Sequence, residues 1–267
     1  MIYILTSKMG NKYDHRHVNL LYSSIEKKYD KEFKFICVTD NPNNLNSKIE
    51  VVVAKEEFKY AFNKVQFFKD GFANIPLGSQ AIIMDIDIEV VSDPSPVFDY
   101  EINNNTVGCF HKWWQYPYRS CFIWGGIYRF KTGTTQRIYN RLKENPEVYY
   151  KRYMELYNYK IIEKLNQNPV KGEQDFVLES LTVYNYHIHL FPSFYSETMQ
   201  YEVFQALNNK KVNGYINFDQ AIENPQVLEK SRAKTYFTIK SFNKKDRAKL
   251  IFNHYSGLHD DYVRGLS

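Results

Sequence analysis

The sequence predicts a single α/β domain with a mostly parallel sheet that helices cover on both faces. Short apolar strands alternate with amphipathic helices through the first half of the chain, an order typical of parallel sheets. The 267 residues are 43% apolar and 24% charged, which is close to ordinary globular usage. Neither an internal repeat nor a low-complexity linker divides the chain, so we expect one domain over residues 1–267.

The first half of the chain contains four predicted strands and two predicted helices. Ile2–Thr6 is an apolar run that fits a buried strand, and the apolar residues within Asp14–Tyr29 recur at helical spacing. A turn signal, Asp40-Asn41-Pro42, follows the second strand. A second helix is expected around Val65 and Phe68. The other predicted strands are Phe33–Thr39, Ile49–Val53 and Gln80–Met84.

The second half of the chain has a less regular pattern. Thr134 or Thr135 is placed to cap a helix that carries Ile138 and Leu142. The remaining predicted elements are helices over Tyr149–Leu165 and Gln174–Leu181 and strands over Val107–Phe110, Cys121–Phe130 and Thr182–Leu190.

Charge and composition argue against several classes of protein. The net charge is +5, but Lys and Arg are scattered along the chain, so we expect no nucleic-acid partner. The longest apolar run, Met1–Leu5, is far shorter than the roughly 20 residues of a membrane span, and it is too short for a signal-peptide core. Three cysteines without a close pair fit a reducing compartment. We therefore expect a cytoplasmic protein without a transmembrane segment.

Two carboxylates follow the apolar strand Gln80–Met84. Asp85 and Asp87 are two residues apart, so on an extended chain their side chains lie on the same side. Ligands of open α/β sheets bind beyond the carboxyl ends of strands, and two carboxylates in one cleft repel each other unless a cation lies between them. Oxygen ligands of this kind suit Mg²⁺ or Mn²⁺. The alternative is that both residues simply end a strand and face solvent.

Seven segments carry a further signal by their order along the chain. They are Ile2–Thr6, Phe35–Asp40, Asn63–Phe68, Asp85–Asp87, Phe122–Ile127, Gly172–Asp175 and Phe252–Gly257. Together they resemble the corresponding segments of the GT-A fold glycosyltransferases, in particular the group of glycogenin and the bacterial lipopolysaccharide galactosyltransferases. The resemblance covers about residues 1–260. It implies a Rossmann-like mixed sheet, with a nucleotide-binding half in residues 1–100 and an acceptor-side half in residues 101–267.

The resemblance also implies a metal site and a site for a nucleotide diphosphate sugar, with a UDP-sugar favoured. Asp85, Asp87 and His254 would be the metal ligands, and a neutral imidazole among them favours Mn²⁺ over Mg²⁺. Asp40 would hold the base of the nucleotide. The other residues expected to contact the donor are Thr6, Lys64, Ile86, Gly125, Gly126 and Gly257, and those expected in catalytic roles near the anomeric carbon are Glu173, Gln174 and Asp175.

Aromatic residues make up 17% of the chain, more than usual. Packing explains most of them, but tryptophan faces also stack on sugars. Trp113, Trp114 and Trp124 lie near the expected acceptor cleft and are candidates for such stacking.

The function that these motifs favour is transfer of a hexose to a glycan or protein hydroxyl, with retention of the anomeric configuration. Two competing functions are nucleotidyl transfer and catalytically silent binding of a carbohydrate or a partner protein. Each motif also has a purely structural interpretation. His254 is then a buried core histidine, Asp40 forms a turn, and Gln174 and Asp175 begin a helix.

Overall fold

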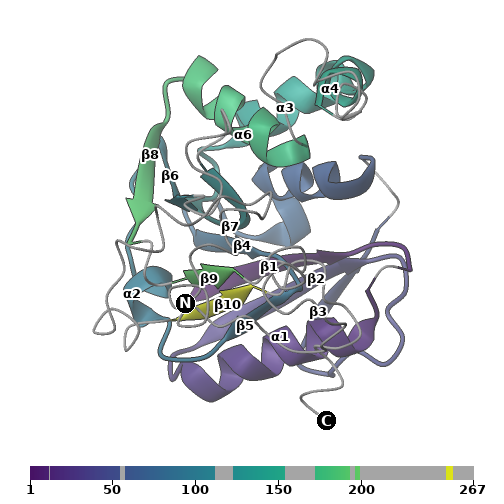
Figure 1. The fold of residues 1–267 in the computed structure, drawn as a ribbon, viewed down its shortest axis with the longest axis vertical. Helices are drawn as coiled ribbons and strands as arrows, with labels where there is room; N and C mark the ends of the chain where they lie inside the picture. Colours follow the sequence, from purple (N-terminus) through teal and green to yellow (C-terminus); the bar gives the residue numbers. More distant parts are fainter. Residues whose placement is uncertain are drawn as a thin grey trace, which may run out of the picture.

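The computed structural model describes residues 1–11, 13–54, 58–111, 123–153, 172–192, 196–198 and 251–254, and the fold is given for these residues. Seven strands form one sheet in the order β3-β2-β1-β4-β7-β6-β8 (Figure 1). Their bounds are β1 (Ile2–Lys8), β2 (Phe33–Thr39), β3 (Glu50–Val53), β4 (Gln80–Met84), β6 (Thr106–His111), β7 (Ile123–Lys131) and β8 (His187–Phe191).

The sheet is mixed and mostly parallel, as the sequence predicts. Strand β1 pairs in parallel with both β2 and β4, β2 with β3, and β6 with β8, whereas β7 is antiparallel to both its neighbours. A second, three-stranded sheet has the order β5-β10-β9. It joins β5 (Ile88–Val90), which follows β4 closely, to β9 (Ser196–Thr198) and to β10 (Phe252–His254) from the far end of the chain.

Helices cover both faces of the large sheet, as Figure 1 shows. Helix α1 lies on one face, and η1, α3, α4 and α6 lie on the other. The bounds are α1 (His15–Lys28), the 3₁₀ helices η1 (Tyr60–Phe68) and η2 (Phe72–Asn74), α2 (Ser95–Phe98), α3 (Gln136–Glu144), α4 (Pro146–Tyr153) and α6 (Gly172–Val183).

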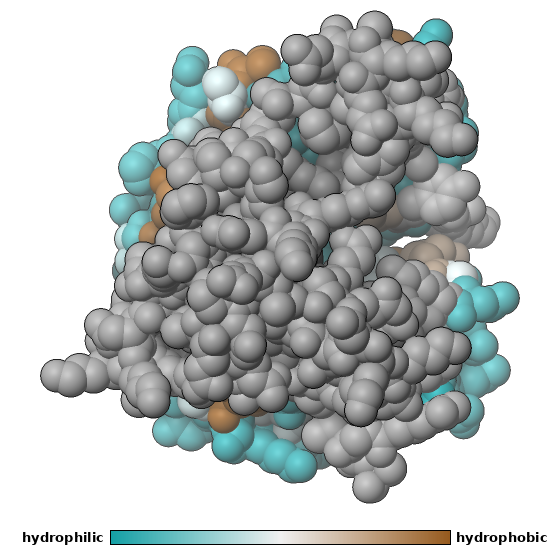
Figure 2. Space-filling view, viewed as in Figure 1, coloured by the Kyte–Doolittle hydropathy of each residue, from teal (hydrophilic) through white to brown (hydrophobic). Residues whose placement is uncertain are grey.

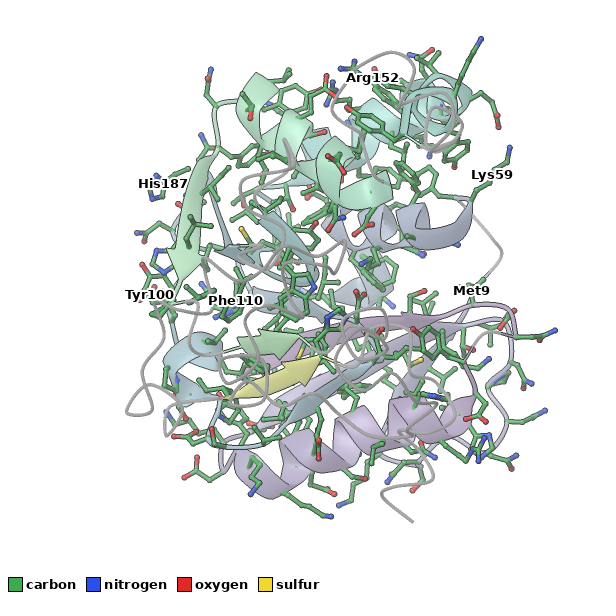
Figure 3. The ribbon with its side chains drawn as sticks, viewed as in Figure 1. Met9, Lys59, Tyr100, Phe110, Arg152 and His187 are labelled. Carbon is green, nitrogen blue, oxygen red and sulfur yellow. The ribbon has the colours of Figure 1, made fainter. Side chains whose placement is uncertain are left out.

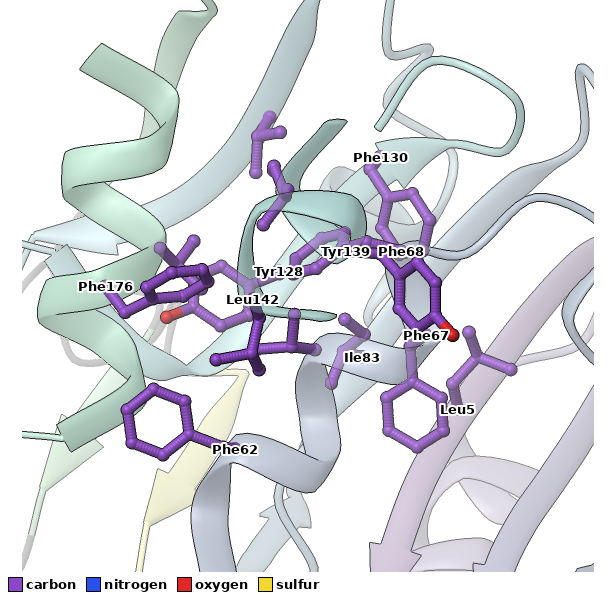
Figure 4. Packing of buried hydrophobic residues seen from close by; sticks show 14 of the residues in the cluster. Leu5, Phe62, Phe67, Phe68, Ile83, Tyr128, Phe130, Tyr139, Leu142 and Phe176 are labelled. Atoms are coloured by element: carbon purple, nitrogen blue, oxygen red, sulfur yellow. The ribbon is translucent and has the colours of Figure 1, made fainter. Parts of the chain in front are cut away.

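The core beneath η1, α3 and α6 is largely aromatic. Figure 4 shows Phe62, Phe68, Tyr128, Phe130 and Phe176 packed together with aliphatic neighbours. The rings of Phe68 and Phe130 meet edge to face, with centroids 5.1 Å apart, a geometry that the ring quadrupoles favour. Packing thus accounts for many of the aromatic residues in the sequence.

Helix α1 begins and ends where the sequence predicts. Asp14 is its N-cap and accepts a hydrogen bond from the backbone of Arg16, while His17 completes a capping box. Tyr29 is the C-cap, so the predicted range Asp14–Tyr29 is the helix together with its two caps. The strands over Phe33–Thr39 and Gln80–Met84 also have their predicted bounds.

The predicted strand Thr182–Leu190 is wrong in its first half. Helix α6 continues to Val183, and β8 begins only at His187. The helix ends because Asn185 takes a left-handed conformation with φ of 55°. The backbone N–H of Tyr186 then donates to the carbonyl of Leu181, and that of Asn185 to the carbonyl of Thr182, which is a Schellman cap.

The second predicted helix forms, but as the 3₁₀ helix η1. Phe62, Val65 and Phe68 are buried at intervals of three residues, the period of a 3₁₀ helix, although Phe67 and the polar residues Asn63 and Gln66 are buried as well. The side chain of Asn63 accepts a hydrogen bond from the backbone of Phe58. Such local bonds compete with those of an α-helix. Of the predicted helix Tyr149–Leu165, the part up to Tyr153 is helical, and the rest lies outside the described residues.

No helix among the described residues is both long and apolar enough to cross a membrane. The described residues at the rim of the view in Figure 2 are mostly hydrophilic, with a few separate apolar ones. Cys37 and Cys109 are buried and carry free thiols.

A buried arginine ties β7 to the connection after β5. Arg129 is 1% exposed, and its guanidinium donates to four backbone carbonyls. Burial lowers its pKa to about 10. The carbonyls that it satisfies belong to Ala81, Val97, Phe98 and Tyr100.

We expect the substitution Arg129→Met to lower the free energy of unfolding by about 3 kcal/mol or more, because it leaves several buried carbonyls without a donor. Urea denaturation measures the change. The matched control is Arg137→Met on the exposed side of α3, which should cost less than about 0.5 kcal/mol. Equal denaturation midpoints for the two variants would contradict this assignment.

Candidate active site

The paired carboxylates follow β4 at the carboxyl end of the sheet. The backbone N–H of Asp85 still donates to the carbonyl of Gly126 on β7, at 2.9 Å. Ile86 and Asp87 then form a turn that leads into β5, and the Ile86 side chain is buried in the core with only 4% exposed. Ile86 therefore anchors the turn, and the acidic residues stand on either side of it.

The two carboxylates affect each other electrostatically. Burial raises the pKa of Asp85 to about 6, against the opposing effect of Lys64. The negative charges of Asp87 and Glu173 act in the same direction as burial and contribute to that value. Asp85 therefore lies in a field of excess negative charge, which an added cation would relieve.

Lys64, from η1, is the cation that compensates Asp85. Its Nζ donates to Oδ1 of Asp85 and to the carbonyl of Gly125, each at 2.9 Å, and lies 2.9 Å from Oε1 of Glu173. Burial alone would lower the pKa of Lys64, but the charges of Asp85 and Glu173 outweigh it and raise the pKa above its ordinary value. Lys64 thus links the end of β4, strand β7 and the start of α6.

A bulge in β7 lies next to the carboxylates. Strand β6 pairs with β7 through Cys109 and Tyr128 and again through Phe110 and Trp124, so residues 125–127 bulge between the paired parts. The bulge frees backbone groups that the site uses, since the carbonyl of Gly125 accepts from Lys64. Bulges are common beside active sites because they redirect the chain there.

Close contacts at the bulge leave no room for a side chain at either glycine. A Cβ atom on Gly125 would lie 2.5 Å from Oε1 of Glu173, and the Gly125 N–H donates to Oε1 of Gln174 at 3.3 Å. A Cβ atom on Gly126 would lie 2.2 Å from the indole of Trp124. The two glycines therefore admit α6 on one side and a tryptophan on the other.

Asp87 meets two side chains from distant parts of the chain. Its Oδ2 accepts a hydrogen bond of 2.9 Å from the Tyr13 hydroxyl, and its Oδ1 lies 3.5 Å from Nε2 of His254. Burial, followed by the charge of Asp87, raises the pKa of Tyr13, so its hydroxyl stays protonated. His254 arrives by way of β10, where it pairs with Ile88 of β5.

His254 is held in place by its own neighbours. It is 7% exposed, and its ring lies 4.8 Å from that of Trp124, centroid to centroid. Trp124 is itself 3% exposed and packs edge-on against Phe110, which Figure 3 labels in the interior of the fold. Trp124 is thus a packing residue, and the stacking role that the sequence suggested for it is wrong. Trp113 and Trp114 lie outside the described residues.

The predicted base-binding end lies where β1 and β2 finish. The Asp40 carboxylate accepts from the backbone N–H of Gly10 at 2.8 Å and lies 3.6 Å from the ammonium of the buried Lys8. Met9, labelled in Figure 3, stands in the same loop. The hydroxyl of Thr6 is fully buried and donates to the carbonyl of Met84, so it joins β1 to β4.

The predicted site residues are brought together only in part. Asp85, Lys64, Gly125 and Glu173 form one connected group, and Asp87 and His254 form a second beside it. Asp175, on α6, is buried at 7% exposure, whereas Gly257 lies outside the described residues. Within the described ranges, no three His, Cys, Asp or Glu side chains converge as a formed metal site. Both carboxylate oxygens of Asp85 accept from Lys64.

A separate pocket opens at the opposite edge of the sheet, where β7 ends and β6 begins. Its volume is about 370 Å³, and it contains none of the predicted site residues. Its lining is polar and includes one cationic side chain. The lining residues are Asn104, Asn105, Gly133, Thr134, Gln136, Arg137 and Tyr186.

Comparison with known proteins identifies the fold. No protein-family model matches the chain, and no curated protein matches its sequence. Solved structures do match. The galactosyltransferase LgtC, solved with donor and acceptor sugar analogues, is 13% identical with a TM-score of 0.50, and the match covers 96% of this chain and 87% of LgtC.

Two further glycosyltransferases are similar over almost the whole chain. GlyE of Streptococcus pneumoniae is 10% identical with a TM-score of 0.54, and the match covers 96% of this chain and 55% of GlyE. Mouse xyloside xylosyltransferase 1 is 10% identical with a TM-score of 0.53, and the match covers 96% of this chain and 98% of that enzyme. This chain therefore has the GT-A fold of these glycosyltransferases, and the predicted fold class is confirmed.

Sequence reasoning missed Tyr13, and it gave Lys64 only a contact with the donor. Tyr13 lies between a loop and α1, with no motif around it, and the residue that it contacts is Asp87, far along the chain. Because buried carboxylates are tolerated only beside a cation, Lys64 could have been predicted to pair with one of them.

We expect Lys64→Met to lower the free energy of unfolding by about 3–5 kcal/mol in EDTA at pH 7, because it leaves Asp85 and Glu173 buried without their cation. Urea denaturation measures the loss. Lys59→Met is the matched control, since Lys59 pairs with Glu147 at the same 2.9 Å on the surface and should cost less than about 1 kcal/mol. The assignment is wrong if both variants lose the same amount.

Proposed function

We propose that the protein is a metal-dependent glycosyltransferase that moves a hexose from a nucleotide diphosphate sugar, preferably a UDP-sugar, to a hydroxyl of a glycan or protein. One observation carries the proposal. Two carboxylates stand at the carboxyl end of β4, and one of them, Asp87, meets an imidazole, His254, from the distant strand β10. The GT-A fold favours glycosyl transfer over nucleotidyl transfer and over silent binding.

The donor set fits a divalent cation. Ligand bonds of about 2.0–2.2 Å that meet near 90–110° place two ligand atoms about 3–3.6 Å apart. Oδ1 of Asp87 and Nε2 of His254 are 3.5 Å apart, within this range. Asp85 is the third ligand in this proposal, and the excess negative charge around it favours a cation. The imidazole favours Mn²⁺ over Mg²⁺.

Glycosyl transfer leaves negative charge on the departing diphosphate and positive charge on the sugar ring. A bound divalent cation supplies Lewis-acid stabilisation of the diphosphate. Lys64 adds a fixed positive charge at the same end of the sheet, and its hold on Glu173 and the Gly125 carbonyl keeps it there. Its charge therefore needs little reorganisation during the reaction.

The start of α6 supplies the groups for the sugar. Glu173 and Gln174 are fixed against the bulge in β7, and Asp175 is buried one residue further on. In the proposed retaining reaction these groups lie beside the anomeric carbon and stabilise its positive charge. Asp40 lies at the end of β2, where we place the base of the nucleotide. The donor would then lie over the buried residues Thr6 and Ile86 and over Gly126, between Asp40 and the carboxylates.

The two competing functions remain measurable alternatives. A nucleotidyltransferase would need a glycine-rich, basic phosphate loop after β1, whereas the loop after Lys8 contains the single glycine Gly10. A silent binding protein would have no need for a carboxylate pair next to a buried lysine and an imidazole. The cytoplasmic location and the absence of a nucleic-acid partner stay predictions from the sequence.

We expect UDP to raise the melting temperature by on the order of 5–10 °C at 100 times its Kd, and only when Mn²⁺ is present. Asp87→Asn should abolish this shift because it removes a ligand charge while preserving shape. Asp30→Asn is the control. It removes one negative charge between α1 and β2, at the end of the sheet opposite to the carboxylates, and should keep the shift in melting temperature. A preference for triphosphates would favour nucleotidyl transfer, and no response from the wild type would favour silent binding.

The proposed retention predicts the configuration of the product. When a UDP-hexose with a known anomeric configuration is turned over, the new glycosidic bond should have that same configuration. Proton NMR of the product reads it from the coupling constant of the anomeric proton. An inverted product would mean that Glu173 or Asp175 acts as a base on the acceptor hydroxyl.

A further inference from the structure

Tyr13 holds one oxygen of a carboxylate whose other oxygen faces a histidine. The Tyr13 hydroxyl donates to Oδ2 of Asp87 at 2.9 Å, while Oδ1 of the same carboxylate lies 3.5 Å from Nε2 of His254. The Asp87 side chain is 14% exposed, so solvent has little part in orienting it. These two contacts, from opposite ends of the chain, fix the rotation of the carboxylate group.

The start of α1 fixes Tyr13 in turn. Its ring meets the imidazole of His17 edge to face, with centroids 5.1 Å apart. His17 is 2% exposed and belongs to the capping box of α1 with Asp14. Asp14 also holds Arg16, with its Oδ2 2.6 Å from the guanidinium. Tyr13 is therefore anchored to a helix end rather than to a loose loop.

We infer that Tyr13 is a positioning residue that presets Asp87, through their hydrogen bond, to bind a divalent cation. The inference rests on the proposed function and deepens it. A carboxylate that is already oriented loses less freedom when it binds a cation, and outer hydrogen bonds to ligating carboxylates typically contribute 10–100-fold to metal affinity. Tyr13 bonds to Oδ2, and Oδ1 is the oxygen that faces His254, the second ligand of the proposed cation.

The hydrogen bond from Tyr13 also has an effect that opposes metal binding. A hydroxyl that donates to Asp87 withdraws part of the negative charge that attracts a cation. If that loss dominated, removing the hydroxyl would strengthen metal binding rather than weaken it. The sign of the change therefore decides between positioning and competition.

The test compares Tyr13→Phe with the wild type by titration with Mn²⁺ alone, followed by the EPR signal of the free ion. We expect Mn²⁺ affinity to fall by about 10-fold or more. Tyr29→Phe is the matched control, because the Tyr29 hydroxyl donates to Asp99 at 2.7 Å at the opposite end of α1. The control should bind Mn²⁺ as the wild type does. Unchanged or tighter binding by Tyr13→Phe would overturn the inference.

A second measurement needs no metal and separates the two proposals. In the metal-free protein, the ¹³C shift of the Asp87 carboxyl should move in Tyr13→Phe and stay constant in Tyr29→Phe. If the wild type takes up no Mn²⁺, the proposed function is wrong. If the Asp87 carboxyl signal also fails to move in Tyr13→Phe, the hydrogen bond itself is wrong. If the wild type and Tyr13→Phe bind Mn²⁺ equally well, only the positioning role of Tyr13 is wrong.

Discussion

The ammonium group of Lys64 belongs to a short 3₁₀ helix, yet it contacts the end of β4, the bulge of β7 and the start of α6. Two of these contacts are with carboxylates, Asp85 and Glu173, that would otherwise face each other in a buried environment. Buried charges are tolerated only when they are paired. The cation therefore permits the acidic groups of the candidate site to gather at one edge of the sheet.

The bulge of β7 makes that gathering possible in the backbone. Gly125 directs its carbonyl to Lys64 and its N–H to Gln174, and Gly126 directs its carbonyl to Asp85. The Gly126 bond continues the ladder between β4 and β7, whereas without the bulge the two Gly125 groups would pair with β6. The resemblance implies that both glycines contact the donor. In the described residues, the atoms nearest to them belong to Glu173, Gln174, Tyr128 and Trp124.

Much of the fold could be predicted because local signals determine it. The apolar strand Gln80–Met84 and the capped helix after Asp14 depend on residues close in the chain, and both form as predicted. The ending of α6 could not be predicted in this way, because it depends on the left-handed conformation of Asn185. The site follows the same division. The pair Asp85 and Asp87 is visible as a motif, whereas contacts between distant residues have no local signal.

The two interpretations of His254 are compatible. A histidine that is 7% exposed, lies with its ring tilted against that of Trp124 and pairs in a strand with Ile88 has every feature of a buried core residue. That same packing removes the rotational freedom that a metal ligand would otherwise lose on binding. Trp124 thus holds His254 in place on the small sheet. Gly126 leaves room for the Trp124 indole because it has no side chain.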